Sequence, residues 1–255
     1  MTPHADPTKI RRGPGPPRSP ARFASNVRPP EGDYLWVYLW GWPLRVMHWT
    51  AAFAVVALVV TGIYIGRPFV TTSGEAVDHF LMGRMRFVHF LAAAFLVATG
   101  IVRLYWLFMG NRFERWPALI PLRGREWKAL WLQLKYYALL EPVRPRYLGH
   151  NPLQQIMYTG VYVIVVIMAI TGFAMYGQSN PTGLIAGAFG WVAPMLGGMQ
   201  VVRLLHHALM WLLVLFIPIH IYTSLRADWG ERSGVISSMI SGGAFVDSDH
   251  EFLDE

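Results

Sequence analysis

Four long apolar stretches constrain the fold of this chain more than any other feature. They cover about residues 46–65, 87–109, 156–176 and 204–225, and each is close to the roughly 20 residues with which an α-helix crosses a bilayer. The mean hydropathy of +0.34 and the charged fraction of 15% are too apolar for an ordinary soluble domain. The sequence therefore predicts an all-α integral membrane protein built as a four-helix bundle.

Basic residues lie unevenly on the two sides of this predicted bundle. The segment through Arg45, the loop over 110–155 and the segment from Arg226 carry seven, eight and two Lys or Arg residues, whereas the opposite side carries four. The positive-inside rule then places both termini and the middle loop in the cytoplasm. Because topology accounts for the net charge of +7, we expect no nucleic-acid partner.

The regions outside the spans divide by composition. Residues 1–33 contain eight prolines and no apolar run, which predicts a disordered cytoplasmic arm and not a signal peptide. We expect the membrane domain over 34–245 and a cytoplasmic tail over 246–255. Within the middle loop, residues 116–140 resemble an amphipathic helix at the membrane interface, with Trp127 and Trp131 on one side and lysines flanking them.

Histidine is the main candidate metal ligand of the apolar stretches, and the chain has no cysteine. The absence of cysteine excludes cysteine-ligated iron–sulfur clusters and covalently attached c-type haem. An arginine stands three residues before a histidine in three places, Arg45 and His48, Arg86 and His89, and Arg203 and His206. Ionisable residues at membrane depth usually mark function. These histidines, with His220, are therefore predicted to be axial ligands of haem iron, and the arginines to be partners of haem propionates.

Depth sorts the four histidines into two levels. The first span runs outward from His48 and the second runs inward from His89. His220 lies about 21 Å below His206 along the last span, at 1.5 Å per residue. His48 and His220 therefore share the inner level, and His89 and His206 share the outer level. Since each level combines two helices, we expect two six-coordinate haems, with a single haem as the alternative.

A short sequence repeat, here called the internal echo, occurs in both halves of the chain. Val-Val-Thr-Gly-Ile at 59–63 ends the first span, and Ala-Ile-Thr-Gly-Phe at 169–173 ends the third. Two helical hairpins of similar design would produce this echo. Gly62, Gly100 and Gly172 provide either close packing between helices or room for a porphyrin. The remaining histidines are interpreted as surface residues, namely His4, His79, His150 and His250.

Several longer motifs resemble the b-type cytochrome subunit of membrane-bound nickel–iron uptake hydrogenases. They are Arg-Val-Met-His-Trp at 45–49, Phe-Leu-Met-Gly at 80–83, Arg-Phe-Val-His-Phe at 86–90, Arg-Tyr-Leu-Gly-His-Asn-Pro-Leu at 146–153, Thr-Gly-Phe-Ala-Met-Tyr-Gly at 171–177, and the segment at 235–242. The resemblance covers about residues 38–245, and the proline-rich arm departs from it. It extends to formate dehydrogenase gamma subunits, which share the di-haem layout.

The resemblance implies four membrane helices that hold haem b, with His48, His89, His206 and His220 at the family's ligand positions. It also implies a catalytic nickel–iron dimer outside the membrane, whose small subunit is anchored by a C-terminal helix and accompanies a large subunit. Electrons would pass from that small subunit to the outer haem and then to the quinone pool, in a bacterial inner membrane. We expect no catalytic residue for hydrogen cleavage in this chain.

Two other functions remain open from the sequence. The first is the cytochrome b subunit of a formate dehydrogenase or a related periplasmic oxidoreductase, which would show the same histidine layout. The second is a transporter or assembly factor without haem, whose histidines would relay protons or bind metal. Metal transport usually requires ligands in one cluster, whereas these histidines form two levels.

Helical phase separates the two adjacent histidines of the last span. At about 100° per residue, His206 and His220 lie roughly 40° apart, and His207 and His220 roughly 140° apart. We expect His206→Ala to lose haem and His207→Ala to retain it, as measured by haem b absorbance per purified protein. The opposite result would contradict the assignment of His206.

Overall fold

The computed structural model describes residues 34–70, 74, 79–121, 124–141, 147–231 and 234–247. The arm predicted over 1–33 lies outside the described residues. So does the predicted tail, apart from residues 246 and 247.

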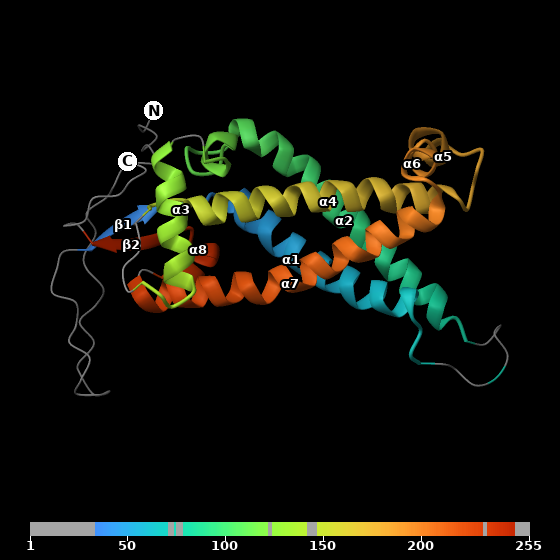
Figure 1. Cartoon of the computed structure of the whole chain (residues 1–255), viewed down its shortest axis with the longest axis horizontal. Helices are drawn as coiled ribbons and strands as arrows, with labels where there is room; N and C mark the ends of the chain where they lie inside the picture. The colour runs from blue at the N-terminus through green and yellow to red at the C-terminus, as the bar shows by residue number, and fades with distance from the viewer. Residues whose placement is uncertain are drawn as a thin grey trace, which may run out of the picture. The chain divides into compact units, whose positions relative to one another are not determined.

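Four long helices match the four predicted spans (Figure 1). They are α1 Trp42–Gly66, α2 Leu81–Met109, α4 Pro152–Gly177 and α7 Met199–Glu231. All four are long and apolar enough to cross a membrane, which confirms the predicted helical membrane protein. Each helix begins four to six residues before its predicted start, because hydropathy marks only the apolar centre while backbone bonding continues into polar flanks.

Local sequence explains how α4 begins. Asn151 precedes the helix, and its Oδ1 accepts a hydrogen bond from the Gln154 backbone N–H at 2.9 Å. In return, Gln154 Oε1 accepts from the Asn151 N–H at 3.0 Å. Pro152 occupies the first helical position, where the missing N–H costs no hydrogen bond. This reciprocal cap therefore sets the start of α4.

The chain forms two compact units. One, here called the sheet unit, comprises Met1–Arg45, Trp106–Ile156 and Ile221–Glu255. The other, here called the bundle unit, comprises Val46–Tyr105 and Met157–His220. The bundle unit therefore contains the central parts of all four long helices.

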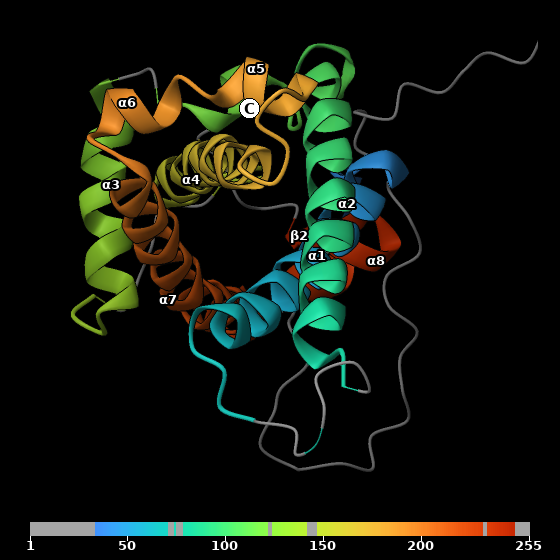
Figure 2. The same ribbon diagram turned by 90° about the vertical axis from the view of Figure 1, so that its right-hand side faces the viewer.

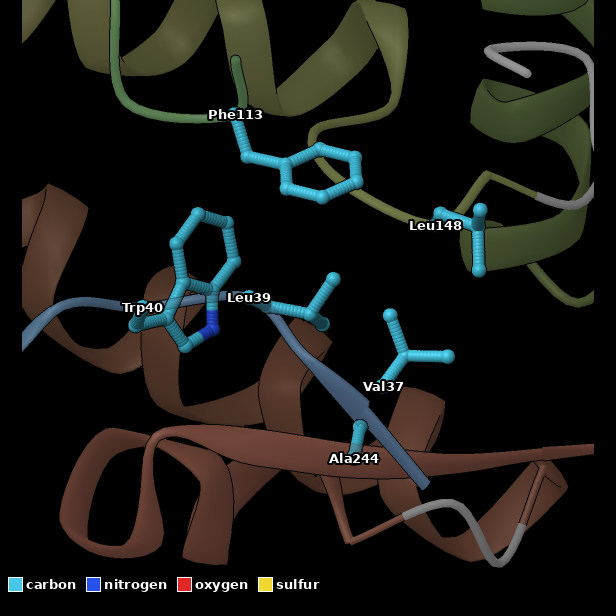
Figure 3. Close-up of a cluster of buried hydrophobic side chains, with 6 residues drawn as sticks. All are labelled: Val37, Leu39, Trp40, Phe113, Leu148 and Ala244. Atoms are coloured by element: carbon cyan, nitrogen blue, oxygen red, sulfur yellow. The ribbon is translucent and has the colours of Figure 1, made fainter. Parts of the chain in front are cut away.

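A two-stranded antiparallel sheet organises the sheet unit, and sequence analysis did not anticipate it. β1 Tyr34–Tyr38 pairs with β2 Gly243–Asp247, with Tyr38 opposite Gly243. The short helix α8 Val235–Ser241 leads directly into β2. Figure 3 shows the buried side chains that point toward one another here, namely Val37, Leu39, Trp40, Phe113, Leu148 and Ala244. The Trp40 indole also donates to the Ser238 hydroxyl at 3.1 Å.

Glu114 ties together three parts of the sheet unit. Its side chain is 1% exposed. Oε1 accepts from the Gly41 N–H at 2.5 Å, and Oε2 accepts from the Trp106 indole at 2.7 Å and the Asn111 N–H at 3.2 Å. A buried carboxylate is costly unless it is hydrogen-bonded. These bonds therefore hold together the segment before α1, the last turn of α2 and the turn that follows α2.

The middle loop contains the short 3₁₀ helix η2 Trp116–Leu119 and the helix α3 Gly124–Tyr137. Side chains of α7 hold the end of α3, because Arg226 donates to the Tyr136 carbonyl and Tyr222 to the Tyr137 carbonyl, both at 3.1 Å. Trp127 and Trp131 are exposed. A helix thus lies within the predicted amphipathic segment, and its place at a membrane surface stays a prediction.

In the bundle unit, Figure 2 looks nearly along α4 and shows α4, α7, α1 and α2 following one another around the bundle. Two short helices, α5 Leu184–Phe189 and α6 Val192–Leu196, join α4 to α7. They contribute to a buried cluster around Ala174, Val192 and Val202. Large apolar side chains cover the outside of the long helices, as expected where a surface faces lipid.

We expect Glu114→Ala to destabilise the sheet unit by about 3 kcal/mol, because the substitution leaves buried N–H groups without their acceptor. Glu114→Gln retains one acceptor oxygen, so its stability should lie between that of Glu114→Ala and that of the wild type. Thermal unfolding of the purified full-length chain, followed by tryptophan fluorescence, measures the difference. Glu141→Ala, at a half-exposed position after α3, is the control. Equal stability of Glu114→Ala and the control would show that the carboxylate has no such role.

Candidate functional site

The four predicted ligand histidines all lie in the bundle unit. His48 is on α1, His89 is on α2, and His206 and His220 are on α7. All four are partly buried. The structure thus brings together, within one compact unit, residues from three helices that are far apart in sequence.

His48 and His220 form a close pair. Their ring centroids are 6.3 Å apart, and the ring planes are inclined by 51°. Aromatic side chains surround them, since Phe216 stacks on His220 at 5.3 Å and Trp49 meets His48 edge-on at 5.2 Å. Tyr158 of α4 also lies with its ring centroid 6.1 Å from that of His220. The pair therefore sits in an aromatic setting formed by α1, α4 and α7.

The other two histidines each contact a threonine on a neighbouring helix. His89 Nδ1 lies 2.9 Å from Thr61 Oγ1 of α1, and His206 Nδ1 lies 2.9 Å from Thr171 Oγ1 of α4. Met210 of α7, one turn after His206, lies beside His89, because a Cβ added at Gly62 would be 3.7 Å from its Sδ and 3.4 Å from His89 Cε1. The internal echo seen in the sequence thus has a structural counterpart, because each Thr-Gly pair meets one histidine.

Glycine makes room for these imidazole rings. A Cβ added at Gly62 would lie 3.4 Å from His89 Cε1, and one added at Gly172 would lie 3.4 Å from His206 Cε1. A Cβ at Gly100 would meet nothing within 4 Å. The two glycines of the echo therefore allow histidine to approach the helix, a role that sequence analysis did not consider.

His207 faces a different helix from His206. A Cβ added at Gly66 of α1 would lie 3.0 Å from His207 Cε1, whereas His206 bonds to α4. Adjacent residues on a helix point about 100° apart, so the two imidazoles cannot share one partner. This geometry agrees with the predicted phase of α7.

The three predicted propionate partners differ in their surroundings. Arg86 and Arg203 are exposed, and Arg203 makes a long hydrogen bond of 3.4 Å to Gln200. Arg45 belongs to the sheet unit, where its Nη1 donates to the Ile240 carbonyl. Arg45 is therefore bonded to a distant segment of its unit, whereas the bond of Arg203 lies within its own helix.

Arg103 has a partner that sequence analysis missed. Its side chain is 7% exposed, and its Nε donates to the Tyr162 hydroxyl of α4 at 3.1 Å. A cation at membrane depth requires such a partner. The tyrosine lies 59 residues away, so no local pattern could have revealed the pair.

The remaining histidines lie apart from these pairs. His79 approaches Gly74, and His4 and His250 fall outside the described residues. His150 was expected at the surface, but it is half-buried in the sheet unit, where its ring centroid lies 4.9 Å from that of Trp40. The contact with Trp40 was not predicted, because the core around Trp40 forms only when distant segments meet.

Comparison with known proteins extends this picture. Residues 39–242 match the family model described as prokaryotic cytochrome b561. A protein of Azotobacter chroococcum mcd 1 named "Probable Ni/Fe-hydrogenase B-type cytochrome subunit" is 44% identical over 81% of this chain and 87% of its own length. One of the same name from Bradyrhizobium diazoefficiens is 41% identical, over 81% and 85%. The "Probable Ni/Fe-hydrogenase 1 B-type cytochrome subunit" of Escherichia coli strain K12 is 33% identical, over 80% and 89%.

We expect Gly172→Val to displace the His206 ring, because the added methyl groups extend beyond a Cβ that already lies 3.4 Å from it. Gly172→Ala should be tolerated, since 3.4 Å is an ordinary van der Waals contact. Gly100→Val is the matched control in α2, where the space is open. Valine favours a helix more than glycine does, so neither valine variant should weaken its helix. A haem content that is lower in Gly172→Val but not in Gly100→Val would therefore show that the His206 ring no longer fits. Equal haem absorbance in both valine variants would contradict it.

Proposed function

Because the chain belongs to the prokaryotic cytochrome b561 family, we propose that it is the haem b electron-transfer and membrane-anchor subunit of a nickel–iron hydrogenase. In this role it passes electrons from a hydrogenase outside the membrane to the quinone pool. The observation that carries the proposal is the set of four partly buried histidines among four membrane-spanning helices, two of them a close pair and two each bonded to a threonine.

The inner pair, His48 and His220, fits an axial ligand pair. A histidine nitrogen lies about 2 Å from a bound metal and about 1.1 Å from its ring centroid, given ring bonds of about 1.33 Å. Two histidines that hold one metal ion could thus have ring centroids up to about 6 Å apart, and the observed value is 6.3 Å. His48 Nδ1 is buried without a hydrogen-bond partner among the described residues.

The outer pair, His89 and His206, supports a second axial set. Each ring is held through Nδ1 by a threonine, so the Nε2 atoms are the ones available to iron. Arg86 and Arg203 stand one helical turn before these histidines and are exposed, which suits charge-assisted bonds to propionates. We keep Arg45 as a predicted propionate partner, through the nitrogens that Ile240 does not engage.

Bound haem would supply reversible one-electron reduction within the membrane. The chain's own side chains do the rest. The histidines would hold the iron from two helices at each level, and aromatic rings lie around His220. Positive charge near propionates favours the electron-rich state. Neither pair provides a nucleophile with a base, so the proposed role is conduction and not bond cleavage.

The proposed partners follow from the relatives and from the predicted topology. The relatives are named as subunits of Ni/Fe-hydrogenases. We propose that this chain binds the hydrogenase small subunit through that subunit's C-terminal membrane helix, and holds the large subunit through it. Both termini and the middle loop lie in the cytoplasm in this proposal, which places His89 and His206 nearer the hydrogenase and His48 and His220 nearer the cytoplasm.

The alternative of a haem-free transporter receives less support. Among the described residues, no group of three or more His, Cys, Asp or Glu side chains is placed to hold a metal ion. His48 and His220, from different helices, form a close pair instead. A pair suits the two axial positions of a haem iron, whereas a bare metal ion in a protein usually takes more protein ligands.

Difference spectra of native membranes test the function and the choice of partner. We expect hydrogen to produce a reduced b-type signal in the wild type that is absent from a strain without this chain. Formate is the matched second donor. A chain-dependent signal with formate alone would favour a formate dehydrogenase subunit, and its absence with both donors and with dithionite would contradict haem binding.

A further inference from the structure

Thr61 and Thr171 make the same pair of contacts in the two halves of the bundle unit. Thr61 Oγ1 lies 2.6 Å from the Ala57 carbonyl of its own helix and 2.9 Å from His89 Nδ1. Thr171 Oγ1 lies 2.8 Å from the Ile167 carbonyl and 2.9 Å from His206 Nδ1. Both threonines are buried, at 4% and 1% exposure.

The single proton of each hydroxyl decides how these contacts are made. A carbonyl oxygen can only accept a hydrogen bond, so the threonine hydroxyl donates to the carbonyl four residues before it. The hydroxyl then has only lone pairs to offer to the histidine. It must therefore accept a hydrogen bond from a protonated Nδ1, and the neutral imidazole carries its lone pair on Nε2.

We propose that Thr61 and Thr171 are positioning residues for the outer haem: each fixes the Nδ1–H tautomer and the ring orientation of one axial histidine. The inference rests on the proposed function, in which His89 and His206 are the outer ligands. It adds residues to that site which neither hydropathy nor the arginine–histidine spacing indicated. The glycine that follows each threonine completes this arrangement, because it leaves room for the histidine ring beside the helix.

An acceptor on Nδ1 also affects what the histidine does at iron. Hydrogen-bond partners of this kind fix the ring and make the ligating nitrogen more basic. A more basic ligand stabilises the oxidised iron, so the two threonines should lower the reduction potential of the outer haem. His48 of the inner pair differs, because its buried Nδ1 has no partner among the described residues.

Isosteric variants distinguish the effect of the hydroxyl group from the effect of the side-chain shape. Thr61→Val and Thr171→Val remove the acceptor, and Thr61→Ser and Thr171→Ser retain it. Thr99→Val is the matched control, because Thr99 makes the same bond to the carbonyl four residues before it, at 2.7 Å, from a half-exposed position of α2. Valine and threonine have similar helix propensities, so backbone effects should be equal in all three positions.

The measurement is a redox titration of the haem absorbance, with electron paramagnetic resonance of the oxidised state, on the intact membrane complex. We expect each valine variant at 61 or 171 to shift one of the two haem potentials upward, to alter that haem's low-spin signal, and to weaken haem binding by about 10-fold. Serine should restore all three properties, and Thr99→Val should resemble the wild type. If a valine variant does not accumulate, the alanine variant replaces it.

Two results would overturn the proposal. One is an unchanged potential and spectrum in the valine or alanine variants, and the other is a shift that serine does not reverse. In both cases a normal hydrogen-reduced b-type signal in the wild type would leave the proposed function intact. A wild type without any haem signal would instead overturn the proposed function, and the role of the threonines with it.

Discussion

A polar side chain inside a bilayer is costly unless another group satisfies it, and this constraint governs the bundle unit. Each histidine of the outer pair bonds to a threonine, and Arg103 bonds to Tyr162. These contacts join α1 to α2, α4 to α7, and α2 to α4. The groups that carry the proposed chemistry therefore also help to define which helices are neighbours.

The parts of the structure that could be predicted from sequence depend on local periodicity. Hydropathy located four spans because a helix must place about 20 apolar residues in the membrane. Depth along each helix grouped His48 with His220 and His89 with His206, and in the structure His48 and His220 lie 6.3 Å apart. Phase on α7 separated His206 from His207, which meet different helices.

The features that could not be predicted from the sequence depend on contacts between residues that are far apart in the chain. Thr61 and His89 are 28 residues apart, and Gly41 and Glu114 are 73 apart. The strand pair joins segments near the two ends of the chain. The repeated Thr-Gly pair was visible in the sequence, but its meaning required knowing that an imidazole from the neighbouring helix lies against it.

The strand pairing has a consequence for how the chain is made. β1 ends at Tyr38, and its partner residue in β2, Gly243, is added about 200 residues later. The backbone groups of β1 have no strand to pair with until β2 has been synthesised. All four membrane helices precede β2 in the chain, so they are synthesised before it. The sheet unit can therefore close only after the helices have left the ribosome. A chain that stops before Gly243 would keep an open strand edge, the kind of feature that quality-control proteases and chaperones encounter in unfinished proteins.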